Sequence, residues 1–175
     1  MSGLHSEGHW EESLLDSVSA ELRDVNGWAG KIRTQSIHLA VLAEPYLEYI
    51  LDGSKTIESR FSVNRCAPYR QVERGDIVIL KRLSGPVVAV CEVSYVNYYE
   101  LDTNTVAEIR SLFTSALRAD DPQFWTDREG AAYATLLRIR NVRRVGPIKC
   151  AKKDRRGWVI IRSRQHTLKL DWGQR

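Results

Sequence analysis

Six short stretches with the pattern of β-strands lie between residues 37 and 162, and most connections between them are too short for a parallel crossover. Each stretch is an apolar run or an alternation of apolar and polar residues. The stretches are IHLAVL at 37–42, KTIESRF at 55–61, IVILKR at 77–82, GPVVAVCEVSYVNYYEL at 85–101, AAYATLLRIRNVRRV at 131–145 and GWVIIR at 157–162. This pattern predicts an α+β fold, a small and mostly antiparallel β-barrel with flanking helices.

Three segments have the periodicity of helices. Residues 9–25 place apolar side chains at helical spacing with acids between them, which predicts an amphipathic helix ahead of the main domain. Residues 43–53 predict a short helix with Pro45 in its first turn and Gly53 as its left-handed stop. Residues 103–117 predict a third helix. We expect an N-terminal helical extension over 1–33, a main domain over 34–164 and a C-terminal tail over 165–175.

Composition limits the class of protein. The 175 residues are 43% hydrophobic and 27% charged, as in an ordinary soluble globular protein, and no apolar run is long enough to span a bilayer. No secretory signal is visible, so a cytoplasmic location and no membrane partner are expected. The three cysteines lie far apart without a C-x-x-C pair, and no acidic cluster suggests a two-metal centre. We therefore predict no metal and no other cofactor.

Charge is distributed unevenly along the chain. Residues 1–24 carry six acids and one base, whereas residues 138–164 carry eleven bases and the single acid Asp154. Clustered Lys and Arg gain binding free energy by releasing counterions from phosphates, so the basic segment favours a polyanionic partner. A basic surface without any partner is the alternative interpretation.

The segment ILDGSKTIESRF at 50–61 places Lys55, Glu58 and Arg60 just after the predicted turn at Gly53. In a strand, Glu58 and Arg60 share one face, so they are close enough to pair with each other or to flank a ligand. Charges this close together are usually solvated surface. The alternatives are therefore a binding site, an internal ion pair that orders the end of the barrel, and an exposed charged strand.

Residues 36–162 resemble the ASCH domain, a branch of the PUA-like barrels. The resemblance rests on the pattern G-x-K-x-x-E-x-R, met by Gly53, Lys55, Glu58 and Arg60, and on Gly75 and Asp76 ahead of an apolar strand. It implies a PUA-like barrel of five or six strands, with a cleft beside the first helix of the domain that holds RNA or a modified base. Some ASCH members look like RNA-binding modules, some are reported to cut single-stranded RNA, and a small subgroup hydrolyses N4-acetylcytidine. In that subgroup a threonine nucleophile occupies the position of Glu58, which disfavours this activity here.

The chemistry of the residues suggests their roles. Lys55 can hold a phosphate or, with a pKa lowered by burial, act as a base. Glu58 can accept a hydrogen bond from a base amino group while Arg60 holds a phosphate or a carbonyl oxygen. Tyr49, together with Tyr46, can bring a phenol to the same cleft for stacking or proton transfer, although a helix tyrosine is more often part of the core.

A second group of candidate contacts comes from the basic segment KCAKKDRRGWVIIR at 149–162. Its predicted nucleic-acid contacts are Lys152, Lys153, Arg155 and Arg156, and Arg65 and Lys81 extend the same field. Trp158 follows the basic loop and can stack on a base, although its position at the start of a strand favours a core residue. Trp125 is a weaker candidate for a lid over a bound base.

These observations predict an RNA-binding protein that recognises single-stranded RNA or a modified base in a cleft with a basic surface. The alternative is a metal-independent ribonuclease or an amidohydrolase of modified nucleosides, in which Lys55 acts with Tyr49 or Glu58 as the proton carrier. A third possibility is a protein partner bound through the acidic N-terminal helix.

Overall fold

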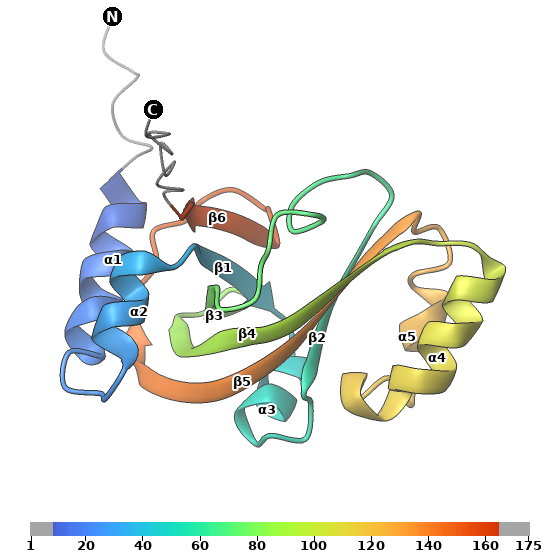
Figure 1. The fold of residues 1–175 in the computed structure, drawn as a ribbon, viewed down its shortest axis with the longest axis horizontal. Coiled ribbons are helices and arrows are strands. Elements are labelled where there is room, and N and C mark those ends of the chain that lie inside the picture. The colour runs from blue at the N-terminus through green and yellow to red at the C-terminus, as the bar shows by residue number, and fades with distance from the viewer. Residues whose placement is uncertain (1–8, 165–175) are drawn as a thin grey trace, which may run out of the picture.

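The computed structural model describes residues 9–164 (Figure 1). The first eight residues of the predicted extension and the predicted tail at 165–175 lie outside the described residues. The helices are α1 (His9–Glu21), α2 (Trp28–Thr34), α3 (Tyr46–Leu51), α4 (Thr103–Leu117) and α5 (Pro122–Thr126). The strands are β1 (Ile37–Leu42), β2 (Ile57–Ser62), β3 (Ile77–Arg82), β4 (Val87–Glu100), β5 (Tyr133–Ile148) and β6 (Trp158–Arg162). All three predicted helices and all six predicted strands are confirmed.

The strands form one curled sheet in the order β2-β5-β4-β3-β1-β6. Only β1 and β3 are paired in parallel, and α3, β2 and the following loop supply the long connection that a parallel pair needs. The other neighbours are antiparallel, and bulges between the long strands β4 and β5 help the sheet to curl into a half-barrel (Figure 1). The prediction of an α+β fold with a mostly antiparallel barrel and flanking helices is confirmed, as a half-barrel with β2 and β6 as its two edges.

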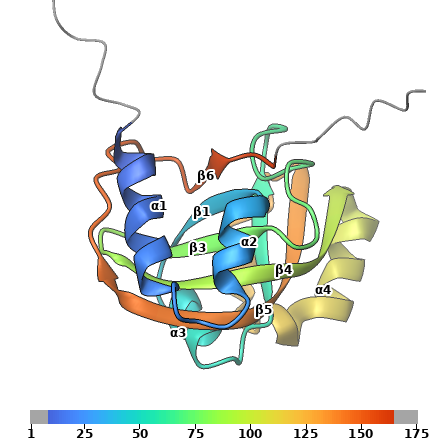
Figure 2. The same ribbon diagram turned by 60° about the vertical axis from the view of Figure 1, so that its left-hand side comes forward.

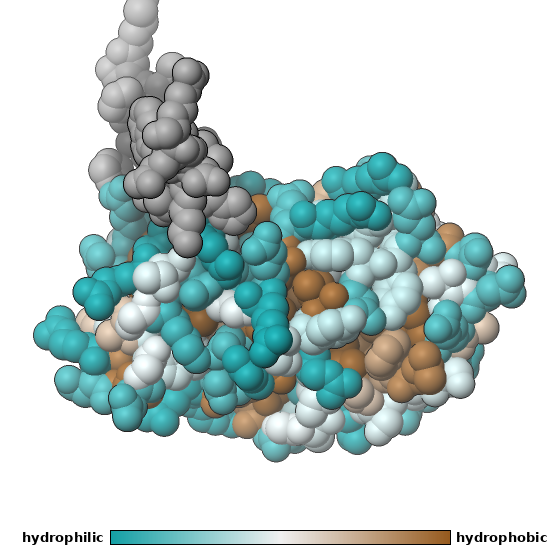
Figure 3. All heavy atoms as spheres, viewed as in Figure 1, coloured by the Kyte–Doolittle hydropathy of each residue, from teal (hydrophilic) through white to brown (hydrophobic). Residues whose placement is uncertain are grey.

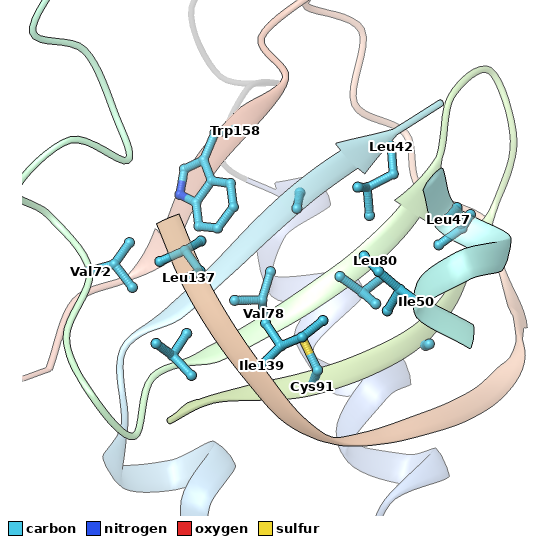
Figure 4. Close-up of a cluster of buried hydrophobic side chains, with 13 residues drawn as sticks. Leu42, Leu47, Ile50, Val72, Val78, Leu80, Cys91, Leu137, Ile139 and Trp158 are labelled. Carbon is cyan, nitrogen blue, oxygen red and sulfur yellow. The ribbon is translucent and has the colours of Figure 1, made fainter. Parts of the chain in front are cut away.

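A hydrophobic core fills the inside of the curl. Val78, Leu80, Cys91, Leu137 and Trp158 converge there from four strands, with Leu47 and Ile50 of α3 at one end (Figure 4). Helix α3 ends as the sequence predicts, since Gly53, with φ of 82°, follows its C-cap Asp52. Pro45, predicted in the first turn, is instead the N-cap before the first helical residue Tyr46. This short helix leads the chain directly into the segment that carries Lys55.

Helices α1 and α2 cover the opposite face of the sheet (Figure 2). Leu14 and Val18 of α1 and the following Leu22 are buried in one cluster with strand residues such as Ile79. The Glu21 carboxylate also accepts a hydrogen bond of 3.2 Å from the Gly146 amide near the end of β5. The domain boundary at residue 33 stays a prediction, but the two helices share a hydrophobic core with the sheet.

A third cluster joins α4 and α5 to β2 and β5, and hydrophobic residues reach the surface where the sheet meets α4 (Figure 3). Trp125 belongs to this cluster: it is 7% exposed, and its Nε1 donates to the Ala119 carbonyl at 3.0 Å. Trp125 is therefore packed in this cluster, and its suggested role as a lid over a base stays a prediction. No helix within residues 9–164 is long and apolar enough to cross a membrane.

Candidate functional site

A cavity of about 440 Å³ lies between the end of β1, strand β2 and helix α5. Its charged lining residues are Lys55, Glu58, Arg60, Asp127 and Arg128, and its aromatic lining residues are Tyr46, Phe61 and Phe124. The volume is in the range of small-molecule sites. The structure therefore brings Lys55, Glu58 and Arg60 together in the wall of one cavity.

Lys55 is held at the junction of three elements. Its backbone amide donates to the Tyr49 carbonyl of α3 at 2.7 Å, and β2 begins only at Ile57, so Lys55 lies in the turn before the strand. Its side chain is 2% exposed, and its Nζ donates to the carbonyls of Ile57 at 2.7 Å and Leu117 at 3.1 Å. Leu117 ends α4, where unpaired carbonyls carry partial negative charge, so this is a favourable place for a cation.

Burial lowers the pKa of the Lys55 ammonium, and the Glu58 carboxylate, with Oε2 at 3.5 Å from Nζ, partly offsets this effect. The Tyr46 ring centroid lies 5.7 Å from Nζ. Two backbone carbonyls and the Glu58 carboxylate are therefore the polar groups that surround the buried Lys55 amine.

The buried Glu58 pairs with the half-buried Arg60 beside Lys55. Glu58 is 5% exposed, and its Oε1 lies 2.9 Å from Arg60 Nε, although the angle does not make a hydrogen bond and Nε has no such partner among the described residues. The guanidinium donates instead to the carbonyls of Gly157 and Val41, each at 3.1 Å. The ion pair considered as a structural alternative is present, and it lies in the cavity wall.

A buried polar chain lies behind Arg60. The guanidinium stands 5.4 Å from the Trp158 ring, and Trp158 Nε1 donates to His38 Nδ1 at 3.3 Å. Because Nδ1 accepts, Nε2 carries the proton and donates to Asp76 Oδ2 at 3.1 Å. Asp76 also accepts from the Glu73 amide at 2.8 Å. The Gly-Asp motif thus orients the indole beneath Arg60, a role that the motif alone did not indicate.

The two tyrosines of α3 differ in position. Tyr46 lines the cavity, and burial raises the pKa of its phenol. Tyr49 is not among the lining residues; its ring lies 4.7 Å from the Arg118 guanidinium, and its carbonyl holds Lys55. A catalytic role for Tyr49 stays a prediction, whereas Tyr46 places a phenol at the cavity.

The predicted basic contacts have different surroundings. Arg65 pairs with Glu100 at 2.8 Å, and Lys81 is 8% exposed and donates to the Arg82 carbonyl at 3.1 Å. Lys152 and Arg156 both bind Asp154. The remaining predicted contacts, Lys153 and Arg155, are exposed. The loop that carries residues 152–156 reaches the site through Gly157, whose carbonyl binds Arg60, whereas Arg65 and Lys81 do not line the cavity.

Sequence reasoning did not identify Arg128 as a site residue. Its guanidinium lies 3.6 Å from the Phe124 ring centroid and 5.6 Å from that of Phe61, and it donates to the Phe124 carbonyl at 2.5 Å. Burial lowers the pKa of Arg128. Residues 119–130 have no strong periodicity, so no signal in the sequence placed them against β2. Among residues 9–164, no group of three or more His, Cys, Asp or Glu side chains is arranged to hold a metal ion.

The fold of this chain is similar to that of several solved structures. No family model matches the chain, and no curated protein matches it. The crystal structure of ASCH from Zymomonas mobilis is similar at a TM-score of 0.59 and 15% identity, covering 72% of this chain and 87% of that one. A tyrosine-to-phenylalanine mutant of the Zymomonas mobilis protein gives a TM-score of 0.57 and 15% identity over 72% and 90% of the two chains. A serine-to-alanine mutant gives 0.58 and 14% over 74% and 90%. The chain therefore has the fold of the ASCH domain.

Proposed function

We propose that the protein binds RNA and receives one unpaired or modified base in the cavity lined by Lys55, Glu58 and Arg60. The observation that carries this proposal is the joint presence of a buried carboxylate, three cations and aromatic side chains in one cavity of about 440 Å³. A carboxylate accepts hydrogen bonds from a base amino group, and aromatic rings offer surfaces on which a base stacks. Recognition of a single extruded base needs both hydrogen bonds to its edge and a surface for stacking.

The basic loop supplies affinity in this proposal. Lys153 and Arg155 are exposed, and the loop reaches Arg60 through the Gly157 carbonyl. Phosphates next to the bound base would therefore pass near these two cations. Lys152, with a side chain 3% exposed and bound to Asp154, keeps the loop in shape rather than contacting a phosphate. Binding should weaken with added salt because phosphate contacts release counterions.

Binding is tested with end-labelled single-stranded RNA in a chelator, on native and denaturing gels of the same reaction. We expect a shifted and intact RNA. Lys55→Ala should weaken binding at any salt concentration. Neutralising Lys153 and Arg155 together should reduce the salt dependence: the slope of log K against log salt concentration should fall by about one unit for each phosphate that is no longer bound. Arg33→Gln, an exposed arginine of α2, is the charge-matched control. No binding at low salt, or binding unchanged by Lys55→Ala in a folded protein, would contradict the proposal.

A metal-independent ribonuclease is the second candidate, and the position of Lys55 favours it. Burial lowers the pKa of this amine, and the Tyr46 ring and the Glu58 carboxylate are its neighbours. A neutral lysine can take the proton of a 2′-hydroxyl while a nearby acid protonates the leaving oxygen. Shortened RNA on the denaturing gel, dependent on Lys55 and unaffected by chelator, would establish this activity instead of simple binding.

A further inference from the structure

A second cavity of about 510 Å³ adjoins the first one, between α4, α5 and β2. Phe61 and Arg128 line both cavities, so they form the wall between them. The second cavity has a mixed lining, with Leu101, Val106 and Trp125 among its apolar residues. The two spaces are similar in size, and each is large enough for one nucleoside.

The shared wall carries a cation, Arg128, that has no carboxylate partner in the described part of the chain. Within residues 9–164, Arg128 makes no ion pair within 4.0 Å, and its guanidinium donates to the Phe124 carbonyl. The guanidinium lies 3.6 Å from the Phe124 ring centroid and 5.6 Å from that of Phe61. The guanidinium has five N–H donors, so most of its hydrogen-bonding capacity is unused. A half-buried cation between two cavities is well placed to bind an anionic group that connects a molecule in one cavity with a molecule in the other.

The second cavity has one further arginine and two acids. Arg110 lies 5.7 Å from the Trp125 ring centroid and is exposed. Asp102 is already used as the N-cap of α4, where it accepts from the Thr105 amide at 2.7 Å, and Glu129 is the other acid in the lining. The cavity is therefore close to neutral, and its lining combines apolar side chains with two arginines. This environment favours a nucleoside over a free phosphate.

We propose that the site binds two consecutive nucleotides of a single strand: one base in the first cavity, the next nucleoside in the second, and the connecting phosphodiester on Arg128. This inference rests on the proposed function, because it assumes that the first cavity receives a base. It adds a second subsite, formed by Arg110 and the apolar residues Leu101, Val106 and Trp125, and it assigns Arg128 to the bridging phosphate.

The experiment compares nucleoside 3′-monophosphates with the dinucleoside monophosphates ApA, CpC, GpG and UpU as competitors of a labelled single-stranded RNA. The best dinucleotide should bind about tenfold or more tightly than its mononucleotide, since one stacked base contributes about 1 to 3 kcal/mol. Arg110→Gln should remove most of this gain and leave mononucleotide binding unchanged. Because a nucleoside 3′-monophosphate already carries the phosphate assigned to Arg128, Arg128→Gln should weaken the binding of mononucleotide and dinucleotide alike, and Arg128→Lys should weaken both less, whereas Arg33→Gln should change neither.

The outcomes separate the two proposals. If mononucleotides compete in a Lys55-dependent way but dinucleotides compete no better, the second subsite is wrong and the first cavity stands. If the dinucleotide gain survives Arg110→Gln, the neighbouring nucleoside lies elsewhere and the inference also fails. If no mononucleotide or dinucleotide competes, base recognition in the first cavity fails, and the second subsite fails with it. Because Arg110 is exposed, its substitution tests the inference without depending on how Arg128 affects folding.

Discussion

The Arg60 guanidinium donates a hydrogen bond of 3.1 Å to the Gly157 carbonyl, and this contact joins the two edges of the curled sheet. Arg60 lies on the edge strand β2, and Gly157 directly precedes the other edge strand, β6. A second bond of 3.1 Å to the Val41 carbonyl reaches β1. One side chain thus spans the gap that backbone pairing leaves open, and the same side chain lines the candidate cavity. The same arginine therefore joins the edges of the sheet and lines the candidate cavity.

Arg60→Gln should destabilise the protein as well as weaken RNA binding. The substitution removes two charge-assisted hydrogen bonds and leaves Glu58 buried beside Lys55 alone, which typically costs about 2 to 4 kcal/mol. The free energy of unfolding in urea measures the loss. Arg155→Gln is the matched control, since this exposed arginine of the neighbouring loop should change stability by less than about 0.5 kcal/mol. Equal stability of Arg60→Gln and the wild type would contradict the bridging role.

Lys55 and Glu58 should be energetically coupled. Their charged atoms lie 3.5 Å apart at a buried position. Removal of either side chain therefore takes away part of the attraction that offsets the cost of burying the other charge. We expect Lys55→Met and Glu58→Gln each to destabilise the protein, and the double variant to cost about 1 to 3 kcal/mol less than the sum of the two. Urea unfolding of the four proteins at one pH measures the coupling. Strict additivity would mean that the two side chains do not interact.

The strands of this fold were predictable because their signals are local. Alternation in residues 55–61 and the apolar runs at 37–42 and 77–82 are each sufficient to indicate a strand, and Gly53 has the positive φ that its position after a helix indicated. The pattern of Lys55, Glu58 and Arg60 is also local, and the structure places all three in one cavity. Features contained within one turn and one strand were therefore accessible to sequence reasoning.

What was missed depends on contacts between distant segments. Arg128 reaches the cavity only because α5 packs on β2, and the Trp158–His38 contact joins residues 120 positions apart. The burial of Lys81 and the binding of Lys152 to Asp154 are likewise set by surroundings that composition does not reveal. A count of basic residues indicates a charged segment, but the neighbours of each cation decide which are free to bind a phosphate.

Glu92 should make stability depend on acid pH. Burial of this β4 carboxylate favours a higher pKa, but hydrogen bonds from Lys31, Arg140 and Asn141 outweigh burial and lower the pKa to about 2. The unfolded state has the ordinary value, 4.5, and therefore binds the proton more tightly than the folded state. The stabilisation from Glu92 is complete above about pH 4.5 and is lost as the pH falls towards 2.

Glu92→Gln separates this contribution from that of the other carboxylates. The variant should be less stable than the wild type at about pH 6, and the difference in free energy of unfolding should shrink as the pH is lowered from about 5 to about 2. Urea unfolding at several pH values gives both curves. Lys31 lies in α2, so loss of its ion pair with Glu92 at low pH should also loosen this helix. Hydrogen exchange of the α2 amides can detect this loosening. Parallel curves for the two proteins would contradict the assignment.

Helix α1 and the residue that follows it should contribute substantially to the stability of the sheet. Leu22, directly after α1, is 1% exposed and packs in the cluster that joins α1 and α2 to the sheet, so Leu22→Ala should lower the free energy of unfolding by about 2 to 5 kcal/mol. Leu112→Ala in α4 is the matched control, because Leu112 is 63% exposed and its truncation removes little packing. Urea unfolding of both variants measures the effect. If Leu22→Ala were as mild as Leu112→Ala, residues 9–33 would behave as a separate extension. A large loss would instead mean that this segment is part of the folded domain.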